Sequence, residues 1–299
     1  MEKTLLVLAG PTAIGKTSCG IQLAEHFSTE IISADSRQIY LETNIGTAVP
    51  TAEELGRVKH HFIQSTSLEN PYNASRFELD ALQTVERLFK DHELVLMVGG
   101  SGLYIDAVCK GIDDLPSADP QLRSRLLEQF SQEGLDPLTK RLKELDPISH
   151  GRVDLKNHMR VLKALEVSIQ TGKPYSSFLS EQKKERPFNI LRVALDMDRE
   201  ELYQRINQRV ELMMEEGLLD EVKSLVRFQH LTAMKTVGYR ELFGYLDGEI
   251  SLDEAVDLIK RNTRKFARKQ LTWFRKGQQY TWFHPEQCEE IAAWIKKQE

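Results

Sequence analysis

The stretch that decides the fold is Leu5-Leu6-Val7-Leu8-Ala9-Gly10-Pro11-Thr12-Ala13-Ile14-Gly15-Lys16-Thr17. Its first five residues are apolar without alternation, which is typical of a strand buried on both faces of a parallel sheet. From Lys16 to Phe27 the apolar residues recur at intervals of three and four, so an amphipathic helix is expected directly behind the strand. A strand, a glycine loop and a helix in this order indicate an α/β protein.

The loop matches the pattern G-x-x-x-x-G-K-[ST] in full, and it lies between the predicted strand and helix, as that motif requires. Glycines let the backbone N–H groups and the helix N-terminus face a chain of phosphates. Lys16 can neutralise phosphate charge and Thr17 can ligate Mg²⁺. The predicted diphosphate-binding residues are Gly10, Pro11, Thr12, Ala13, Ile14, Gly15, Lys16 and Thr17.

Further strands are predicted at residues 30–35, 94–98 and 189–195, and a helix is predicted to begin with a capping box of Ser75 and Glu78. Asp198 and Glu201 mark the start of another helix. Residues 115–187 have a charged helical pattern without a strand, and residues 200–294 read as helical. We therefore predict a parallel-sheet core like that of P-loop NTPases in residues 1–114 and 188–299, with a helical C-terminal region. Residues 115–187 are predicted to form an inserted all-helical domain.

Composition narrows the class of protein. The 299 residues include 40 Lys and Arg against 45 Asp and Glu, so the net charge of −5 gives no global basic signature. Cys19, Cys109 and Cys288 lie far apart without a C-x-x-C spacing, so neither a disulfide framework nor a zinc cluster is expected. The N-terminal apolar run is too short for a membrane span or a signal sequence. We expect a cytoplasmic monomer with no membrane partner.

A carboxylate that NTP-hydrolysing proteins place at a strand end is missing, because Leu94 to Val98 runs into Gly99 and Gly100. Asp35 instead follows the second predicted strand, at the edge where ligands of open parallel sheets collect. Its chemistry alone leaves two readings open, a functional carboxylate and a turn cap.

The chain resembles the bacterial tRNA dimethylallyltransferases, the IPP transferase family. Besides residues 10–17, the resemblance rests on these blocks: Ser33-Ala34-Asp35-Ser36-Arg37-Gln38-Ile39-Tyr40, Gly99-Gly100-Ser101-Gly102-Leu103-Tyr104, Ala118-Asp119-Pro120 with Arg123, Ala164-Leu165-Glu166-Val167, Val237-Gly238-Tyr239 and Arg268-Lys269-Gln270-Leu271-Thr272-Trp273-Phe274-Arg275. The segment 156–160, Lys-Asn-His-Met-Arg, departs from the family's usual Asn-Asp-Pro-Gln-Arg. The blocks span nearly the whole length in the family's order.

The resemblance implies transfer of a dimethylallyl group from dimethylallyl diphosphate to the exocyclic amine of the adenosine 3′ of the anticodon, with release of diphosphate. Asp35, Thr17 and Arg209 are then the catalytic residues, with Asp35 as general base, Arg209 as a cation for the leaving group and Mg²⁺ on Thr17. The tRNA contacts implied by the family are Asp35, Ser36, Arg37, Gln38, Ser101, Arg123, Met159, Arg160, Val161, Leu162 and Lys163.

A basic segment supports an RNA partner independently of the resemblance. Residues 257–276 contain eight basic residues against the single acid Asp257, a local net charge of +7. Such a density of charge suits a chain of phosphates, and we expect Arg264, Arg268 and Lys269 to contact tRNA. Phe266, Trp273 and Phe274 lie among these charges and either stack on bases or belong to the core.

Three other functions share parts of this pattern. An adenylate isopentenyltransferase would use the same loop and base on a free nucleotide, but it has no need of the inserted helices or the basic segment. A non-catalytic P-loop tRNA-binding protein would not need Lys16, Thr17 and Asp35 together. A small-molecule kinase is the third alternative, and the missing strand-end carboxylate disfavours it.

Overall fold

The computed structural model describes residues 2–70, 72–113, 115–116, 119–180, 184–276 and 280–298. The chain divides into two compact units, one formed by residues 1–110 and 186–299 and the other by residues 111–185. Residue 114, the predicted end of the first core segment, lies outside the described residues. We call the first unit the core unit and the second the inserted unit.

The core unit is built on a parallel sheet, which confirms the predicted fold class. Its strands are β1 (Thr4–Ala9), β2 (Ile31–Ser33), β3 (His60–His61), β4 (Leu94–Gly99), β5 (Asn189–Leu195) and β6 (Thr281–Phe283). They are ordered β3-β2-β4-β1-β5-β6, and every pairing is parallel. The first strand in the chain therefore lies inside the sheet, between β4 and β5, and the loop that follows it opens at the carboxyl edge.

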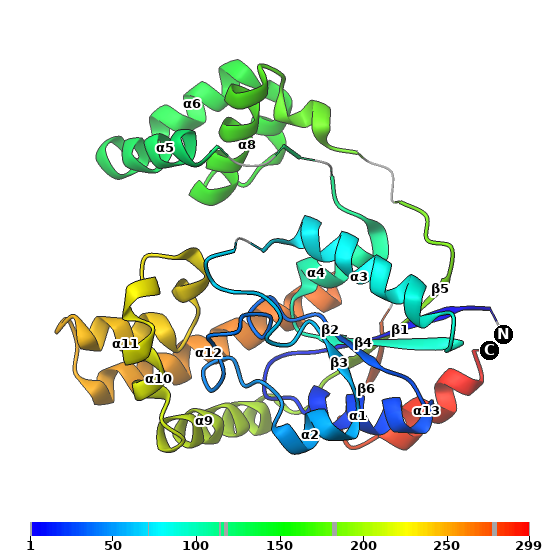
Figure 1. The fold of residues 1–299 in the computed structure, drawn as a ribbon. Coiled ribbons are helices and arrows are strands. Elements are labelled where there is room, and N and C mark those ends of the chain that lie inside the picture. The colour runs from blue at the N-terminus through cyan, green and yellow to red at the C-terminus, as the bar shows by residue number, and fades with distance from the viewer. Residues whose placement is uncertain are drawn as a thin grey trace. The chain divides into compact units, whose positions relative to one another are not determined.

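Helices cover both faces of this sheet (Figure 1). The helices α1 (Lys16–His26) and α13 (Cys288–Lys296) lie on one face, and α3 (Ala74–Leu88) and α4 (Gly102–Lys110) on the other. Leu6 and Leu8 point to the first face, where they share a buried cluster with Ile21 and Ile291. Every residue of β1 is buried, as its uninterrupted apolar pattern predicts.

Further helices form a lobe beside the sheet. They are α9 (Arg199–Glu215), α10 (Leu218–Ser224), α11 (Tyr239–Leu246) and α12 (Leu252–Arg275), with the 3₁₀ turns Val226–Phe228 and Thr232–Lys235. The short helix α2 (Ala52–Arg57) lies beside α1 instead. Tyr239, Leu242 and Ile259 are among the buried residues that join α10, α11 and α12. Asp198 caps α9 by accepting from the N–H groups of Glu200 and Glu201, as the sequence predicts.

Two local predictions are wrong. The helix α3 is capped by Asn73, whose side chain accepts from the Arg76 N–H, and Ser75 lies inside the first turn. The C-terminal region is not wholly helical, because Thr281–Phe283 pairs with β5 as the edge strand β6. Three residues carry too little periodicity to distinguish a short edge strand from a loop.

The inserted unit is helical, with no strand among its described residues. It contains α5 (Pro120–Glu133), α6 (Asp136–Leu145), α7 (Pro147–Arg152), α8 (His158–Thr171) and the 3₁₀ turn Tyr175–Phe178. It has a hydrophobic core of its own, to which Leu126, Leu142 and Leu165 belong. The fully buried Asp146 caps α7 and also accepts from the Ser176 N–H and O–H, which fixes the 3₁₀ turn.

The expectation that the cysteines do not pair is wrong. Cys19 of α1 and Cys288 of α13 form a disulfide across 269 positions of sequence, with their Cα atoms 5.7 Å apart. Spacing in the sequence could not show this pair, because the fold brings the two helices together. Cys109 is a free buried thiol whose pKa is raised to about 11 by burial. In the described part of the chain, no helix is long and apolar enough to cross a membrane.

Candidate active site

The P-loop between β1 and α1 has the strained backbone that its motif requires. Gly15 at the start of α1 has a φ of 102° and Ala13 a φ of 63°, so the chain twice enters the left-handed region. Lys16 donates from Nζ to the Pro11 carbonyl oxygen at 2.7 Å. Burial lowers the Lys16 pKa to about 8, while Asp35 raises it and Arg209 lowers it further. The loop thus presents a cation that a phosphate would hold in its charged form.

The structure explains why no carboxylate follows β4. A Cβ at Gly99 would lie 2.2 Å from the Ala34 carbonyl oxygen, and one at Gly100 would lie 2.4 Å from the Gln270 amide nitrogen. Gln270 fills this space, since it accepts from the Thr12 N–H at 2.9 Å and donates to the Gly100 carbonyl at 3.0 Å. Gln270 therefore braces the P-loop against the end of β4, the place where an NTP-hydrolysing P-loop protein has the carboxylate that holds its metal ion.

Asp35 combines the two roles that its sequence left open. Its Oδ1 accepts from the N–H groups of Arg37 (2.8 Å) and Gln38 (3.3 Å), so this oxygen caps the turn after β2. Among the described residues, Oδ2 has no hydrogen-bond partner. Because Asp35 lines two cavities of the core unit, the second oxygen is available to a ligand.

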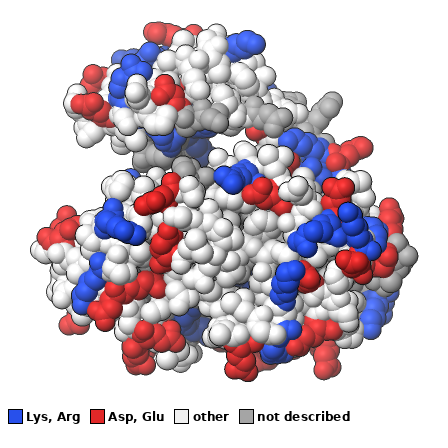
Figure 2. Space-filling model, in the orientation of Figure 1, with Lys and Arg blue, Asp and Glu red and all other residues white. Residues whose placement is uncertain are grey.

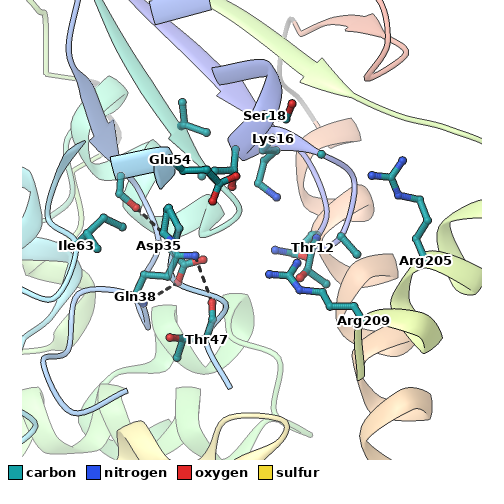
Figure 3. A pocket seen from close by; sticks show the side chains of 18 of the residues that line it. Thr12, Lys16, Ser18, Asp35, Gln38, Thr47, Glu54, Ile63, Arg205 and Arg209 are labelled. Atoms are coloured by element: carbon teal, nitrogen blue, oxygen red, sulfur yellow. Dashed lines mark hydrogen bonds between the residues drawn. The ribbon is translucent and has the colours of Figure 1, made fainter. Parts of the chain in front are cut away.

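The first cavity, of about 670 Å³, opens over the P-loop. Asp35 and Gln38 approach it from one side, and Lys16, Arg205 and Arg209 from the other (Figure 3). Thr17 also lines it. Burial lowers the pKa of the Arg209 guanidinium and Asp35 raises it. Three cationic side chains, Lys16, Arg205 and Arg209, thus line the cavity over the loop, which suits a diphosphate.

A second cavity, of about 290 Å³, adjoins the first. It is lined by the segment 46–48, by Ser36, Arg37 and Ser101, and by residues of α9 and α12. The residues that line both cavities are Thr12, Asp35, Thr47, Arg209 and Phe266. A carboxylate and a guanidinium thus lie where the two spaces meet.

Hydrogen bonds made by the segment after β2 support the place where the two cavities meet. Ser101 accepts from the Ser36 N–H at 3.0 Å. Gln38 donates from Nε2 to the carbonyl oxygens of Thr47 (3.2 Å) and Ala48 (2.7 Å). The structure therefore brings Asp35, Ser36, Gln38 and Ser101 together, as the sequence interpretation requires.

The helix α12 divides its residues between two faces. Phe266 and Gln270 turn toward the cavities, and Phe266 is still 46% exposed. Phe274 is fully buried, and Trp273 donates from Nε1 to Asp106 at 3.1 Å. Of the three aromatics, only Phe266 therefore faces a ligand space.

The basic residues of α12 are not equivalent. Arg264 is directed inward, with Nη1 at 2.6 Å from the Asn207 Oδ1 and its guanidinium over the Tyr203 ring. Exposed are Arg261, Lys265, Arg268 and Lys269 of α12 and Lys276, which directly follows the helix, and none of these five has an ion-pair partner among the described residues. We call these five residues the basic stripe. Figure 2 shows a face of the molecule on which basic and acidic side chains are interspersed. On that face, no broad area carries charge of a single sign.

The inserted unit contains the other residues that the resemblance assigned to tRNA. Arg123 pairs through Nη1 with the buried Glu166 at 2.7 Å, and the Lys163 ammonium lies 3.7 Å from the same carboxylate. The side chains of Val161 and Leu162 are buried in the hydrophobic core of the unit, so a contact with tRNA at these two positions would have to be made by the backbone. Met159 and Arg160 are exposed.

Sequence reasoning missed Arg205, Gln270 and Thr47 as site residues. Arg205 lies one helical turn before Arg209, so the i, i+4 spacing could have placed both on one face of α9. Gln270 is separated from Thr12 by 258 residues, and no local pattern indicates that contact.

Comparisons with known proteins show which family the chain is similar to. The family model described as IPP transferase matches residues 38–277. A tRNA dimethylallyltransferase of Bacteroides thetaiotaomicron is 51% identical over 99% of this chain and 96% of its own length. A protein of that name from Cytophaga hutchinsonii is 47% identical over 99% of this chain and 97% of its own length.

Solved structures show the same likeness. The tRNA isopentenylpyrophosphate transferase of Bacillus halodurans aligns with a TM-score of 0.73 and 35% identity, over 99% of this chain and 96% of its own. A eukaryotic dimethylallyltransferase acting on tRNA aligns with a TM-score of 0.74 and 26% identity, over 92% of this chain and 70% of its own. By its matched family model and its full-length relatives, this chain belongs to the IPP transferase family.

Proposed function

We propose that the chain transfers a dimethylallyl group from dimethylallyl diphosphate to the exocyclic amine of the adenosine 3′ of the anticodon in tRNA. The observation that carries this proposal is the meeting of two cavities at Asp35 and Arg209, one over a P-loop and the other lined by Ser36, Arg37 and Ser101. The prenyl donor would occupy the cavity over the P-loop and the acceptor adenine the second cavity. The reacting carbon and nitrogen atoms would then meet where the two cavities join.

In the proposed reaction, the P-loop and Arg205 hold the diphosphate while the prenyl chain extends toward the junction. The adenine nitrogen attacks the allylic carbon, and the carbon–oxygen bond breaks with its electron pair passing to the bridging oxygen. Lys16 and Arg209 stabilise the negative charge that develops on this leaving group. The amine proton passes to Oδ2 of Asp35, the oxygen that does not cap the turn.

Magnesium fits this site as a companion of the diphosphate. Thr17 offers a hydroxyl in the first cavity, and the described residues contain no group of three or more His, Cys, Asp or Glu side chains that could hold a metal ion. Mg²⁺ commonly keeps its waters and binds through few protein groups and substrate phosphates. Bound there, it would neutralise phosphate charge.

The acceptor base must leave its stack to reach Asp35, because the reacting amine would otherwise be inaccessible inside the anticodon loop. Phe266, half exposed at the junction, offers a ring against which a base or the prenyl group can pack. The basic stripe of α12 supplies charge for tRNA phosphates.

Mass spectrometry of nucleosides tests the proposal directly. Purified protein is incubated with dimethylallyl diphosphate, Mg²⁺ and unmodified tRNA, and the digest is searched for prenylated adenosine. Prenylation confined to the adenosine 3′ of the anticodon is expected, and a tRNA with guanosine at that position is the matched control. Prenylation of free AMP with inert tRNA would establish the adenylate isopentenyltransferase alternative. Binding of tRNA without any product would establish the non-catalytic one.

A further inference from the structure

The carboxylate of Glu221, which lies outside both cavities, holds the backbone of residues 44–46, next to the residues that line the second cavity. Glu221 of α10 accepts through Oε2 from the N–H groups of Asn44 (3.1 Å) and Ile45 (2.7 Å). Its Oε1 accepts from the Gly46 N–H (3.1 Å) and from the Tyr239 O–H (2.6 Å). Four donors from two distant parts of the chain therefore converge on one side chain.

Tyr239 completes this anchor. It is fully buried, and a Cβ at Gly46 would lie 2.6 Å from its ring, so the segment lies directly against the aromatic face. Burial and the nearby Glu221 raise the pKa of Tyr239 above its ordinary value, so the phenol keeps its proton and remains a donor. Because Glu221 accepts four hydrogen bonds, three of them from consecutive backbone N–H groups, it holds the segment 44–46 at several points at once.

The anchored segment leads directly to the reacting groups. Gly46, Thr47 and Ala48 line the second cavity, and Thr47 also lines the first. The Thr47 and Ala48 carbonyls hold the Gln38 amide, and the Gln38 N–H bonds to Oδ1 of Asp35. The segment held by Glu221 is thus connected to the proposed base Asp35 through the side chain and the backbone N–H of Gln38.

We propose that Glu221, supported by Tyr239, is a positioning residue for prenyl transfer, which fixes segment 44–48 as the wall that orients the acceptor adenine against Asp35. This inference rests on the proposed function. Glu221 touches no substrate in this arrangement, because it lines neither cavity. Without the carboxylate, three backbone N–H groups lose their acceptor and the wall samples other positions, so fewer encounters have a reactive geometry.

The test compares Glu221→Ala and Glu221→Gln with Asp220→Asn. Asp220 is the neighbouring acid of α10, is exposed and pairs only with Lys223 within the described chain, which makes it a matched control. Measured are kcat and KM for an anticodon stem-loop at saturating dimethylallyl diphosphate, the Kd of inorganic diphosphate by calorimetry, and hydrogen exchange at residues 44–48.

For Glu221→Ala we expect kcat to fall on the order of 10- to 100-fold, since small misplacements of reacting groups have effects of this size. Exchange at 44–48 should quicken, while the Kd of diphosphate should stay within about twofold, because the P-loop is not part of the anchor. Glu221→Gln keeps one acceptor oxygen, so its kcat should lie between those of Glu221→Ala and the wild type. The kcat of Asp220→Asn should equal that of the wild type.

An active wild type with an Ala variant of unchanged kcat overturns the inference alone. Equal losses in kcat and in diphosphate binding would also overturn it, because they indicate general damage to the fold. A wild type that does not prenylate tRNA overturns the proposed function and with it the inference.

Discussion

Two arginines that the sequence assigns to substrate lie in opposite surroundings. Arg209 of the core unit lines both cavities, and its guanidinium has no hydrogen-bond partner among the described residues. Arg123 of the inserted unit is paired at 2.7 Å with a carboxylate that is 1% exposed. The first is an unsatisfied cation in a ligand space, whereas the second already has a structural partner. A cation without a partner is the better indication of a ligand site.

The strongest test of this contrast is the carboxylate opposite Arg209. Asp35→Asn keeps the turn cap but removes the base, so kcat should fall on the order of 10²–10⁴-fold with little change in tRNA affinity. Single-turnover kinetics and a tRNA binding assay check it. A variant within tenfold of the wild type would leave Asp35 as a turn cap only.

The basic stripe sharpens the comparison for RNA binding. Neutralising Lys265, Arg268 and Lys269 together should reduce the slope of log K for tRNA against log salt by roughly 2–3 units, at about 0.7–0.9 per phosphate contact. Arg264→Gln is the control, because Arg264 is directed toward Asn207 and should change the slope little. If the two variants behave alike, the RNA lies elsewhere.

Lys16 predicts a pH dependence of ligand binding. Burial lowers its pKa to about 8, so above that pH the binding of diphosphate must be accompanied by uptake of a proton on Lys16. Affinity should be flat below pH 8 and fall by up to about tenfold per pH unit above it. Calorimetry in buffers of different ionisation enthalpy should show proton uptake that grows from pH 7 to pH 9. Equal uptake in Lys16→Met would assign it to another group.

Breaking the pair in the inserted unit should have the smallest effect. Among the described residues, Arg123→Ala leaves the buried Glu166 with the more distant Lys163 as its one cationic partner, so the unit should lose about 1–2 kcal/mol of stability. Urea unfolding measures this, with the exposed Arg125→Ala as control. A large loss of tRNA affinity without a loss of stability would instead make Arg123 a contact residue, as the family resemblance implies.

The parts of this structure that local sequence determines were predictable. The P-loop, β1 and α1 follow from neighbouring residues, and Asp35 from its place after a strand. The roles of Gln270 and Glu221 were not predictable, because each acts on a loop more than 170 residues away. A motif also does not show which side chains face inward, and the burial of the Val161 and Leu162 side chains was for that reason not predicted. The Cys19–Cys288 pair was missed for the same long-range reason.

The position of β1 inside the sheet determines when this strand can fold during synthesis of the chain. Its partners are β4 and β5, which end at residues 99 and 195, and α1 packs against a helix that begins at residue 288. During synthesis β1 therefore has no pairing partner until these later segments have emerged, while the inserted unit, whose core is built from contiguous sequence, can fold earlier. The P-loop is thus synthesised long before Gln270, the residue that braces it from 258 positions further along the chain.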